Sequence, residues 1–288
     1  MGSEKIINNN VDLEKLHELF KSNGKKMLFY HRDADGVCSA AIMLKFFPDF
    51  ISMPREGPAI EDSFYDNIIS ENPSLIVFVD MPVDQEWKKL LELKKDLPNI
   101  NIVIIDHHII EKDMNSEDGF VHINPRFIDK EAYIPAACVV YEVMKRMDND
   151  VEPVMWISIT GIIGDYGFED CDWMFKEHAK ISNVTTDELA HVSNMISSAI
   201  TLKGINGAQI ALQSLLESND CNGILESEKM IKWNKIVQEE VKRITDDFEE
   251  NKEKLDDKKV IFYEIKSNMN ITSIIATITA ERYPDYVV

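Results

Sequence analysis

The sequence predicts an α/β protein with a mostly parallel sheet and helices on both faces, followed by a long connecting helix and the start of a second, smaller α/β domain. Short uninterrupted apolar runs such as Leu75–Val79 are typical of strands that are buried on both faces of a parallel sheet. These runs alternate with helical patterns, which indicates crossover connections. A single apolar stripe on a highly charged segment in the second half indicates one long helix.

Four apolar runs are expected to form the strands of the sheet, and helical patterns separate and follow them. The expected strands are Lys26–Tyr30, Phe50–Met53, Leu75–Val79 and Ile102–Ile105. The expected helices are Val37–Phe47, Ile60–Ser70, Asp84–Asp96, Pro135–Met147 and Val154–Gly164.

The second half of the chain is mainly helical. Residues 187–216 have helical patterns, and a stripe then recurs at spacings of three or four residues, which is the period of one helix face. We expect a helix over about residues 227–257 whose stripe packs on the main domain, since a stripe this short favours such packing over a coiled-coil dimer. The stripe residues are Met230, Trp233, Val237, Val241, Ile244 and Phe248.

The division into domains follows from this change of character. Residues 1–225 are expected to form the main domain, residues 226–258 the connecting helix and residues 259–288 a smaller domain. In the last unit a strand, Val260–Ile265, a helix, Ile271–Tyr283, and the beginning of another strand are expected. Because the chain stops inside this β-α-β pattern, we expect the smaller domain to be incomplete.

The composition limits the classes of partner. With 31 Lys and Arg against 51 Asp and Glu, the formal net charge of −20 argues against a diffuse basic surface for nucleic acid or anionic membranes. An acidic pocket that holds divalent metal ions and so attracts phosphate is compatible with this charge. The four cysteines lie far apart, which favours a reducing compartment. No apolar run approaches the roughly 18 residues of a membrane span, so we expect a soluble, cytoplasmic protein without a membrane partner, of open oligomeric state.

Acidic and histidine side chains follow the apolar segments where these end. The first strand runs into His31-Arg32-Asp33-Ala34-Asp35-Gly36, the strand Leu75–Val79 into Asp80, the strand Ile102–Ile105 into Asp106-His107-His108, and the apolar helix after Val154 into Asp165. Because the carboxyl ends of parallel strands meet at one edge of a sheet, we expect these groups to converge there. Clustered carboxylates repel one another unless cations compensate, and carboxylates with imidazoles but no thiolate suit Mn²⁺ or Mg²⁺ better than structural zinc.

Each of these segments alone has an ordinary explanation. A single Asp at a strand end is about as often a helix cap or turn residue as a metal ligand, and His107 and His108 alone could be core or loop histidines. The four segments together favour a joint metal site. Three other histidines fall in helical patterns away from these segments and are expected on the surface: His17, His178 and His191.

Four short motifs resemble a known family. HRDADG, FVD, IDHH and GIIGD resemble the ordered motifs of the DHH phosphoesterase superfamily, which is named for its Asp-His-His triplet. The resemblance spans residues 26–167, with further agreement at Asn124-Pro125 and in the helix that begins Pro135-Ala-Ala. It implies that residues 1–225 form the catalytic domain and that residues 259–288 begin the associated substrate-binding domain. The superfamily includes RecJ-type single-strand exonucleases, nano-RNA and cyclic-dinucleotide phosphodiesterases and, more distantly, pyrophosphatases and exopolyphosphatase.

The resemblance further implies a two-metal site occupied by Mn²⁺, with Mg²⁺ as the alternative. It assigns His31 and Asp33 to the first ion, Asp35, His107 and Asp165 to the second, and Asp80 to a bridge between them. Two cations about 3.5–4 Å apart can lower the pKa of a bridging water and so supply hydroxide at neutral pH.

The resemblance gives roles to three more residues beside the metals. His108 would contact the substrate phosphate or carry a proton, and Asp106 would orient the histidines. Arg32 could reach a substrate phosphate or could simply be a paired surface charge. One departure concerns Phe29, which stands where several relatives have a metal-binding His; in this chain His31 is the candidate, as in RecJ-like archaeal members.

The functional hypothesis is a Mn²⁺-dependent phosphodiesterase that hydrolyses single-stranded or short oligonucleotides or dinucleotides, in which Asp80 and His108 are the catalytic residues. The alternatives are hydrolysis of pyrophosphate or polyphosphate, and a non-catalytic, replication-associated scaffold of the same superfamily. The form of HRDADG favours the RecJ and nano-RNase branches over the first alternative, and the complete set of acidic residues argues against the second. A long strand needs an extended basic track, and because the sequence has none, short substrates are favoured.

Overall fold

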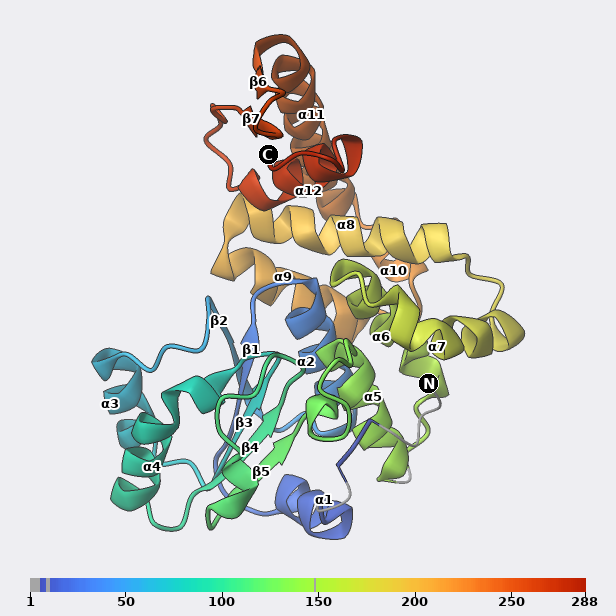
Figure 1. Ribbon diagram of the computed structural model, residues 1–288. Helices are drawn as coiled ribbons and strands as arrows, with labels where there is room; N and C mark the ends of the chain where they lie inside the picture. The colour runs from blue at the N-terminus through green and yellow to red at the C-terminus, as the bar shows by residue number, and fades with distance from the viewer. Residues whose placement is uncertain (1–5, 9–10, 148) are drawn as a thin grey trace.

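Figure 1 shows the computed structural model of the chain, which describes residues 6–8, 11–147 and 149–288. Within these residues the central element is a sheet of five parallel strands in the order β2-β1-β3-β4-β5. The strands are β1 (Lys26–His31), β2 (Ile51–Arg55), β3 (Leu75–Val79), β4 (Asn101–Ile105) and β5 (Phe120–Ile123). The predicted α/β class with a mostly parallel sheet is therefore confirmed.

The register of the sheet brings the ends of four strands to one level. Tyr30 lies opposite Val79, Val79 opposite Ile105, and Ile105 opposite Ile123. The residues that come next along each strand are therefore neighbours at one edge. These residues are His31, Asp80, Asp106 and Asn124.

Two elements of this part of the fold were not predicted. β5 is only four residues long and contains His122, so it lacks the apolar run that marks the other strands. The helix α1 (Leu13–Lys21) buries only Leu16 and Phe20, which are four residues apart, and it begins at the N-cap Asp12. Both patterns are too short to stand out in the sequence.

Helices cover both faces of the sheet, as predicted. Side chains alternate along a strand, so Leu28 and Tyr30 of β1 pack in one hydrophobic cluster with α2 (Ala34–Phe46) and α5 (Ala136–Arg146). Met27 and Phe29 pack in a second cluster with α3 (Asp62–Glu71) and α4 (Trp87–Asp96). Phe29 is thus a core residue, stacked on Phe78 with ring centroids 5.4 Å apart.

A helical layer extends the first cluster beyond the sheet. Figure 1 shows these helices beside and above α2 and α5. They are α6 (Met155–Gly164), α7 (Phe168–Ile181), α8 (Thr186–Lys203), α9 (Ile205–Glu217) and α10 (Asn222–Leu225). Short 3₁₀ turns complete the main part of the chain: η2 (Val83–Glu86), η3 (Met114–Ser116), η4 (Pro125–Phe127) and η5 (Glu152–Val154).

His178 corrects one expectation. It was expected on the surface, but it is buried on the inner face of α7 together with Cys171 and Met174. These residues are spaced three and four apart, so they share one helix face. His178 occupies a position on the buried face of α7 that is usually apolar. The helical pattern did not reveal this because histidine is polar.

The long helix α11 (Glu228–Asn251) divides its apolar stripe between two clusters. Met230 is buried in the large cluster of the main part. Val237, Val241 and Ile244 pack with Ile271 and Ile275 of the C-terminal segment, and Leu202 of α8 is packed against the same cluster. The expectation that the whole stripe packs on the main domain therefore holds only in part, since its second half also packs on the chain that follows it.

The C-terminal segment continues from α11 with short elements, shown in orange and red in Figure 1. β6 (Glu253–Leu255) and β7 (Val260–Phe262) form an antiparallel pair, and α12 (Thr272–Arg282) follows. An isolated bridge joins Val260 to Val287 in parallel. Among the described helices, none is both long and apolar enough to cross a membrane.

Candidate metal centre

The residues predicted as metal ligands converge at the carboxyl ends of the strands, together with His108, which was predicted to contact the substrate phosphate. They fall into three overlapping groups, and within each group one potential ligand atom per residue lies within 4.8 Å of the others. The groups are His31, Asp33 and Asp80; Asp35, His107 and Asp165; and Asp80, His107 and His108. The arrangement brings together side chains that are more than 130 residues apart in sequence.

Asp80 lies at the centre of these groups and has an unusual backbone. Its φ is 58°, in the left-handed region, where a residue other than Gly is uncommon. Its N–H donates to the carbonyl of Ile105 at 3.0 Å, so β4 holds the residue in place. The carboxylate is 2% exposed, with Oδ1 3.3 Å from Nε2 of His107 and Oδ2 3.5 Å from Nδ1 of His31. Strained residues cluster at functional sites. The carboxylate of Asp80 lies between two candidate metal ligands, His31 and His107.

Asp33 and Gly36 shape the loop after β1. Asp33 is the N-cap of α2, and its Oδ1 accepts from the N–H of Gly36 at 2.9 Å while its Oδ2 lies 2.7 Å from Nδ1 of His31. Gly36 lies in the first turn of α2, and a Cβ on it would lie 2.2 Å from the carbonyl oxygen of His31. Position 36 therefore requires glycine, because the first turn of α2 passes very close to the end of β1.

Asp35 is fixed by the start of another helix. Its two carboxylate oxygens accept from the N–H groups of Ala136 and Ala137 at 2.7 and 2.8 Å, so it caps α5 from a distant part of the chain. Gly161 of α6 passes so close that a Cβ there would lie 3.0 Å from Oδ1 of Asp35 and 2.6 Å from Cβ of Ala137. The motif glycine thus allows α6 to bring Asp165 to the same place.

Asp165 is held by the end of α6. It is the C-cap residue, and the N–H groups of Tyr166 and Gly167 turn back to the carbonyls of Ile163 and Ile162 at 3.2 and 3.0 Å. This is the paired hydrogen-bond pattern of a Schellman motif. Tyr166 occupies its left-handed position, with φ of 56°, where glycine is usual.

His107 is buried among carboxylates, whereas His108 reaches the surface. Nε2 of His107 lies 3.3 Å from Oδ1 of Asp80 and 3.5 Å from Oδ2 of Asp165. The side chain of His108 is 42% exposed, and its Nδ1 lies 2.8 Å from Oδ1 of the buried Asp106. Asp106 therefore orients His108 through Nδ1, and Nε2 of His108 has no hydrogen-bond partner among the described residues.

Two residues that hold this segment were not predicted to do so. Asn124 donates from Nδ2 to the carbonyl of His108 at 3.0 Å, and Arg126 donates from Nε to the carbonyl of His107 at 2.9 Å. Asn124-Pro125 agrees with the family motif in sequence. Its contact with the Asp-His-His segment depends on the pairing of β4 with β5, which the sequence did not predict.

Tyr133 is the clearest addition to the site. Its phenol donates to Oδ2 of Asp165 at 2.7 Å, and its ring lies 5.4 Å from that of His107. Its backbone N–H donates to Asp170 at 2.7 Å, which anchors the loop to α7. The residue precedes the Ile-Pro-Ala-Ala stretch in a polar loop without periodicity, so the sequence offered no signal beyond nearness to that stretch.

Arg32 lies beside the centre in an ion pair. Its Nη2 is 2.7 Å from Oε2 of Glu56. Of the two alternatives that the sequence allowed for Arg32, a substrate phosphate contact and a paired surface charge, the structure shows the second.

The crowding of acids and imidazoles perturbs their pKa values. Burial raises the pKa of Asp35 well above its usual range, and the charge of Asp80 raises it further. Burial alone would lower the pKa of His107, but the hydrogen bond to Asp80 and nearby carboxylates raise it to about 10. His31 is raised to about 11, against the effect of burial, by Asp33 and Asp80. Without a metal, protonated histidines thus offset part of the negative charge.

The donor set fits divalent metal ions. Oδ2 of Asp80 and Nδ1 of His107 are buried, and neither has a hydrogen-bond partner within the described residues. A carboxylate oxygen can only accept, and Nδ1 of His31 at 3.5 Å makes no hydrogen bond with Oδ2 of Asp80, so a cation would offset the cost of burying this oxygen. Carboxylate oxygens with two or three imidazoles suit Mn²⁺ or Mg²⁺.

A parallel α/β domain with such a group of side chains at its strand ends is of the metal-binding phosphoesterase type. Residues 25–164 match the N-terminal domain of the DHH family. These residues therefore contain a DHH-family N-terminal domain, and most members of that superfamily are metal-dependent hydrolases. No curated protein sequence matches the chain.

Solved structures share this fold at low sequence identity. The crystal structure of exonuclease RecJ bound to manganese is 15% identical, with a TM-score of 0.66, over 94% of this chain and 77% of that one. The DHH domain of a member of the s1p family of ribosomal proteins is 17% identical, with a TM-score of 0.75, over 94% and 72%. CDC45 from Entamoeba histolytica is 12% identical, with a TM-score of 0.63, over 96% and 84%.

Proposed function

We propose that the chain is a divalent-metal-dependent phosphodiesterase that hydrolyses short single-stranded oligonucleotides or dinucleotides, with Mn²⁺ as the main ion and Mg²⁺ as the alternative. The observation that carries the proposal is the place of Asp80, which forms one group of potential ligands with His31 and Asp33 and a second with His107 and His108. His107 in turn belongs to the group that contains Asp35 and Asp165. The likeness to an exonuclease with bound manganese supports it.

In this proposal His31 and Asp33 hold one ion, Asp35, His107 and Asp165 hold the other, and Asp80 contacts both. Bound ions would lower the pKa of a coordinated water and neutralise phosphate oxygens during displacement. The protein positions the ligands beforehand: Asp33 and Asp35 are fixed by backbone N–H groups, and Asp165 by Tyr133. Such prior fixation keeps the carboxylates together in spite of their repulsion.

His108 is proposed to contact the substrate phosphate and to carry a proton. Burial would lower its pKa, but the hydrogen bond to Asp106 raises it above the ordinary value. A raised pKa favours the protonated imidazole, which could donate from Nε2 to a phosphate or leaving-group oxygen. Arg32 is a weaker candidate for phosphate contact, because it would have to leave Glu56.

Charge favours a short substrate. The net charge of −20 resists a long polyanion, and the contact with substrate would then be concentrated at the metals and His108. We further propose that residues 1–225 form the catalytic domain, that residues 226–258 connect it to the C-terminal segment, and that residues 259–288 belong to a substrate-binding domain.

Activity on a panel of substrates tests the proposal. The protein is incubated with Mn²⁺ and pApA, oligo-DNA, oligo-RNA, cyclic dinucleotides or pyrophosphate. Faster turnover of a short nucleic acid than of pyrophosphate is expected, and it should vanish with chelator and in His108→Ala. Asp80→Asn should be inactive as well, and Asp62→Asn, which changes an exposed acid of the main part, is its charge-matched control and should keep the activity. Preference for pyrophosphate would favour the phosphoanhydride alternative, and inactivity on every substrate would favour the scaffold alternative.

A further inference from the structure

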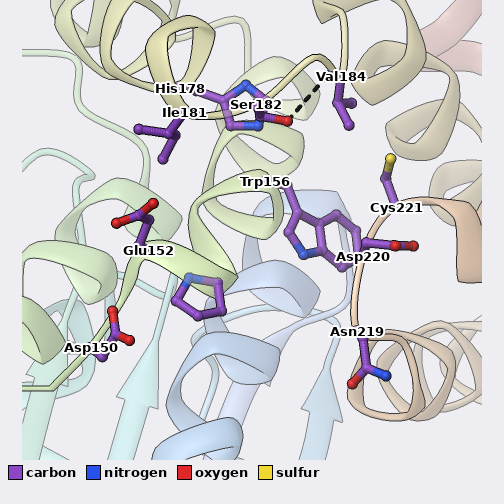
Figure 2. A pocket seen from close by; sticks show the side chains of 11 residues that line it. Asp150, Glu152, Trp156, His178, Ile181, Ser182, Val184, Asn219, Asp220 and Cys221 are labelled. Carbon is purple, nitrogen blue, oxygen red and sulfur yellow. Dashed lines mark hydrogen bonds between the residues drawn. The ribbon is translucent and has the colours of Figure 1, made fainter.

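A pocket with a volume of about 380 Å³ lies at the N-terminal end of α6. It is bordered by η5, the first turn of α6, the end of α7 and the connection between α9 and α10 (Figure 2). Trp156 lines this pocket, whereas Asp165 of the candidate metal centre caps the other end of the same helix. Nine residues of helix span about 14 Å, so the pocket is a separate site.

Trp156 presents an unused hydrogen-bond donor there. The residue is 6% exposed, and its Nε1 is buried with no partner within the described residues. Figure 2 shows the indole among the lining side chains, with Glu152 across from it and Asp220 and Cys221 beside it; the indole nitrogen lies at the lower edge of the ring in this view. An indole nitrogen can only donate, and a buried donor without an acceptor is unfavourable. A ligand with an acceptor oxygen would remove this penalty.

The charged residues of the pocket are all acidic. Asp150, Glu152 and Asp220 line it, and within the described part of the chain none of them has a Lys, Arg or His nitrogen within 4.0 Å. Among the described residues, Asp220 accepts one local backbone hydrogen bond, from the N–H of Asn222 at 2.9 Å. Burial lowers the pKa of His178, so its imidazole is neutral at pH 7 and adds no positive charge. The pocket therefore attracts cations and repels the phosphates of the proposed substrate.

We propose that this pocket binds a small organic cation that also carries an acceptor oxygen, as in an arginine-like compound with a guanidinium group and a carbonyl. The cationic group pairs with Glu152 and its acidic neighbours and lies near the indole ring, where cation–π attraction adds to the ion pairs. The oxygen accepts from Nε1 of Trp156. Ile181 and Val184 supply apolar wall for the aliphatic stem.

Titration calorimetry with two matched probes tests the proposal. N-acetyl-L-argininamide carries a guanidinium, and N-acetyl-L-citrullinamide has the same backbone with a neutral urea. Saturable binding of the arginine compound to one site per chain, at least tenfold tighter than that of the citrulline compound, is expected. Absence of saturable binding, or equal affinity for the two probes, would overturn the proposal.

Variants show whether the binding takes place in this pocket. Glu152→Gln should weaken the arginine compound severalfold, whereas Glu239→Gln, an equal charge change on an exposed face of α11, should not. Trp156→Phe keeps a ring but removes the donor, and it should weaken both probes. If both Gln variants weaken the affinity for the arginine compound equally, the compound is attracted by the overall charge of the protein, and a specific site in this pocket is refuted. Asp80→Asn should bind like the wild type, so this result does not depend on the proposed phosphodiesterase activity.

Discussion

The carboxylate of Asp35 accepts a hydrogen bond of 2.7 Å from the backbone N–H of Ala136, 101 residues away in the chain. Its other oxygen accepts from the next N–H of α5, whose own N-cap residue, Pro135, offers no side-chain cap. A candidate metal ligand is therefore also a structural cap. Folding and metal binding should depend on the same side chain.

Asp35→Asn should destabilise the protein even without metal. One of the two α5 N–H groups would face the amide nitrogen of Asn and lose its acceptor, and loss of an N-cap costs about 0.5–2 kcal/mol. The relief of charge repulsion with Asp80 offsets part of this loss. Urea unfolding in the presence of a chelator measures the free energy of unfolding. Asp165→Asn, whose carboxylate caps no helix start, is the control and should lose less; equal stability of wild type and Asp35→Asn would refute the capping role.

Asp80→Gly should abolish binding of the metal pair. The wild type is expected to bind about two Mn²⁺ ions per chain, and the variant should bind neither tightly because Asp80 is proposed to serve both. Glycine accepts the φ of 58° without strain, so the variant loses the carboxylate but keeps the backbone. Calorimetry with Mn²⁺ gives the stoichiometry. The control is Asp62→Asn, because a glycine at position 62 would also weaken the helix α3. Unchanged stoichiometry in Asp80→Gly would contradict the shared role.

Tyr133→Phe should weaken Mn²⁺ binding about tenfold, since loss of a partner that orients a metal ligand typically has an effect of 10- to 100-fold. The ring beside His107 remains, so only the hydrogen bond to Asp165 is removed. The Kd for Mn²⁺ is the measurement. Tyr166→Phe, which changes an exposed phenol next to Asp165, should leave the Kd unchanged. If both variants bind Mn²⁺ as the wild type does, Tyr133 does not position Asp165.

The sequence could bring the candidate ligands to one edge of the sheet because most of them lie at or just after the end of a buried element. Asp80 and Asp106 come one residue after a strand, and parallel pairing in register then sets them side by side. No further knowledge of side-chain packing is needed for that step. Asp165 could be placed because the apolar helix before it ends at a glycine-containing turn.

Other features depend on contacts that leave no local pattern. Tyr133 reaches Asp165 across 32 residues from an irregular loop. β5 contains a buried histidine, and its pairing with β4 is set by the sheet. The stripe of α11 is periodic throughout, but periodicity does not tell which neighbour covers each half.

Acidification should loosen the C-terminal segment before the main part unfolds. Glu249 of α11 pairs with Lys252 and accepts from the phenol of Tyr283 at 2.8 Å, and these contacts lower its pKa from 4.5 to about 2. A carboxylate whose pKa is lower in the folded state than in the unfolded state stabilises the fold. This stabilisation is complete at pH values above the unfolded-state pKa, and it is lost as the pH falls to the folded-state pKa. The loss should therefore occur between pH 4.5 and about 2.

Hydrogen exchange of α12, corrected for intrinsic rates, measures this loosening across the same pH range. Glu249→Gln should have faster exchange in α12 already at pH 6 and a smaller change on acidification. Glu239→Gln, on an exposed face of the same helix, is the control. Exchange in α12 that is independent of pH in the wild type would contradict the role of Glu249.

Ile244→Ala should unfold the C-terminal segment without removing metal binding. Ile244 is fully buried in the cluster that joins α11 to Ile271 and Ile275, apart from the core around the sheet. Truncation of a buried Ile to Ala typically costs about 2–5 kcal/mol, and this cluster is too small to absorb such a loss. Proteolysis within residues 253–288 should therefore become faster, while the stoichiometry and Kd for Mn²⁺ stay those of the wild type. Ile231→Ala, at a half-exposed position of the same helix, should change neither. A loss of Mn²⁺ binding in Ile244→Ala would mean that the C-terminal segment and the metal centre fold as one unit, and the proposed boundary at residues 226–258 would then be wrong.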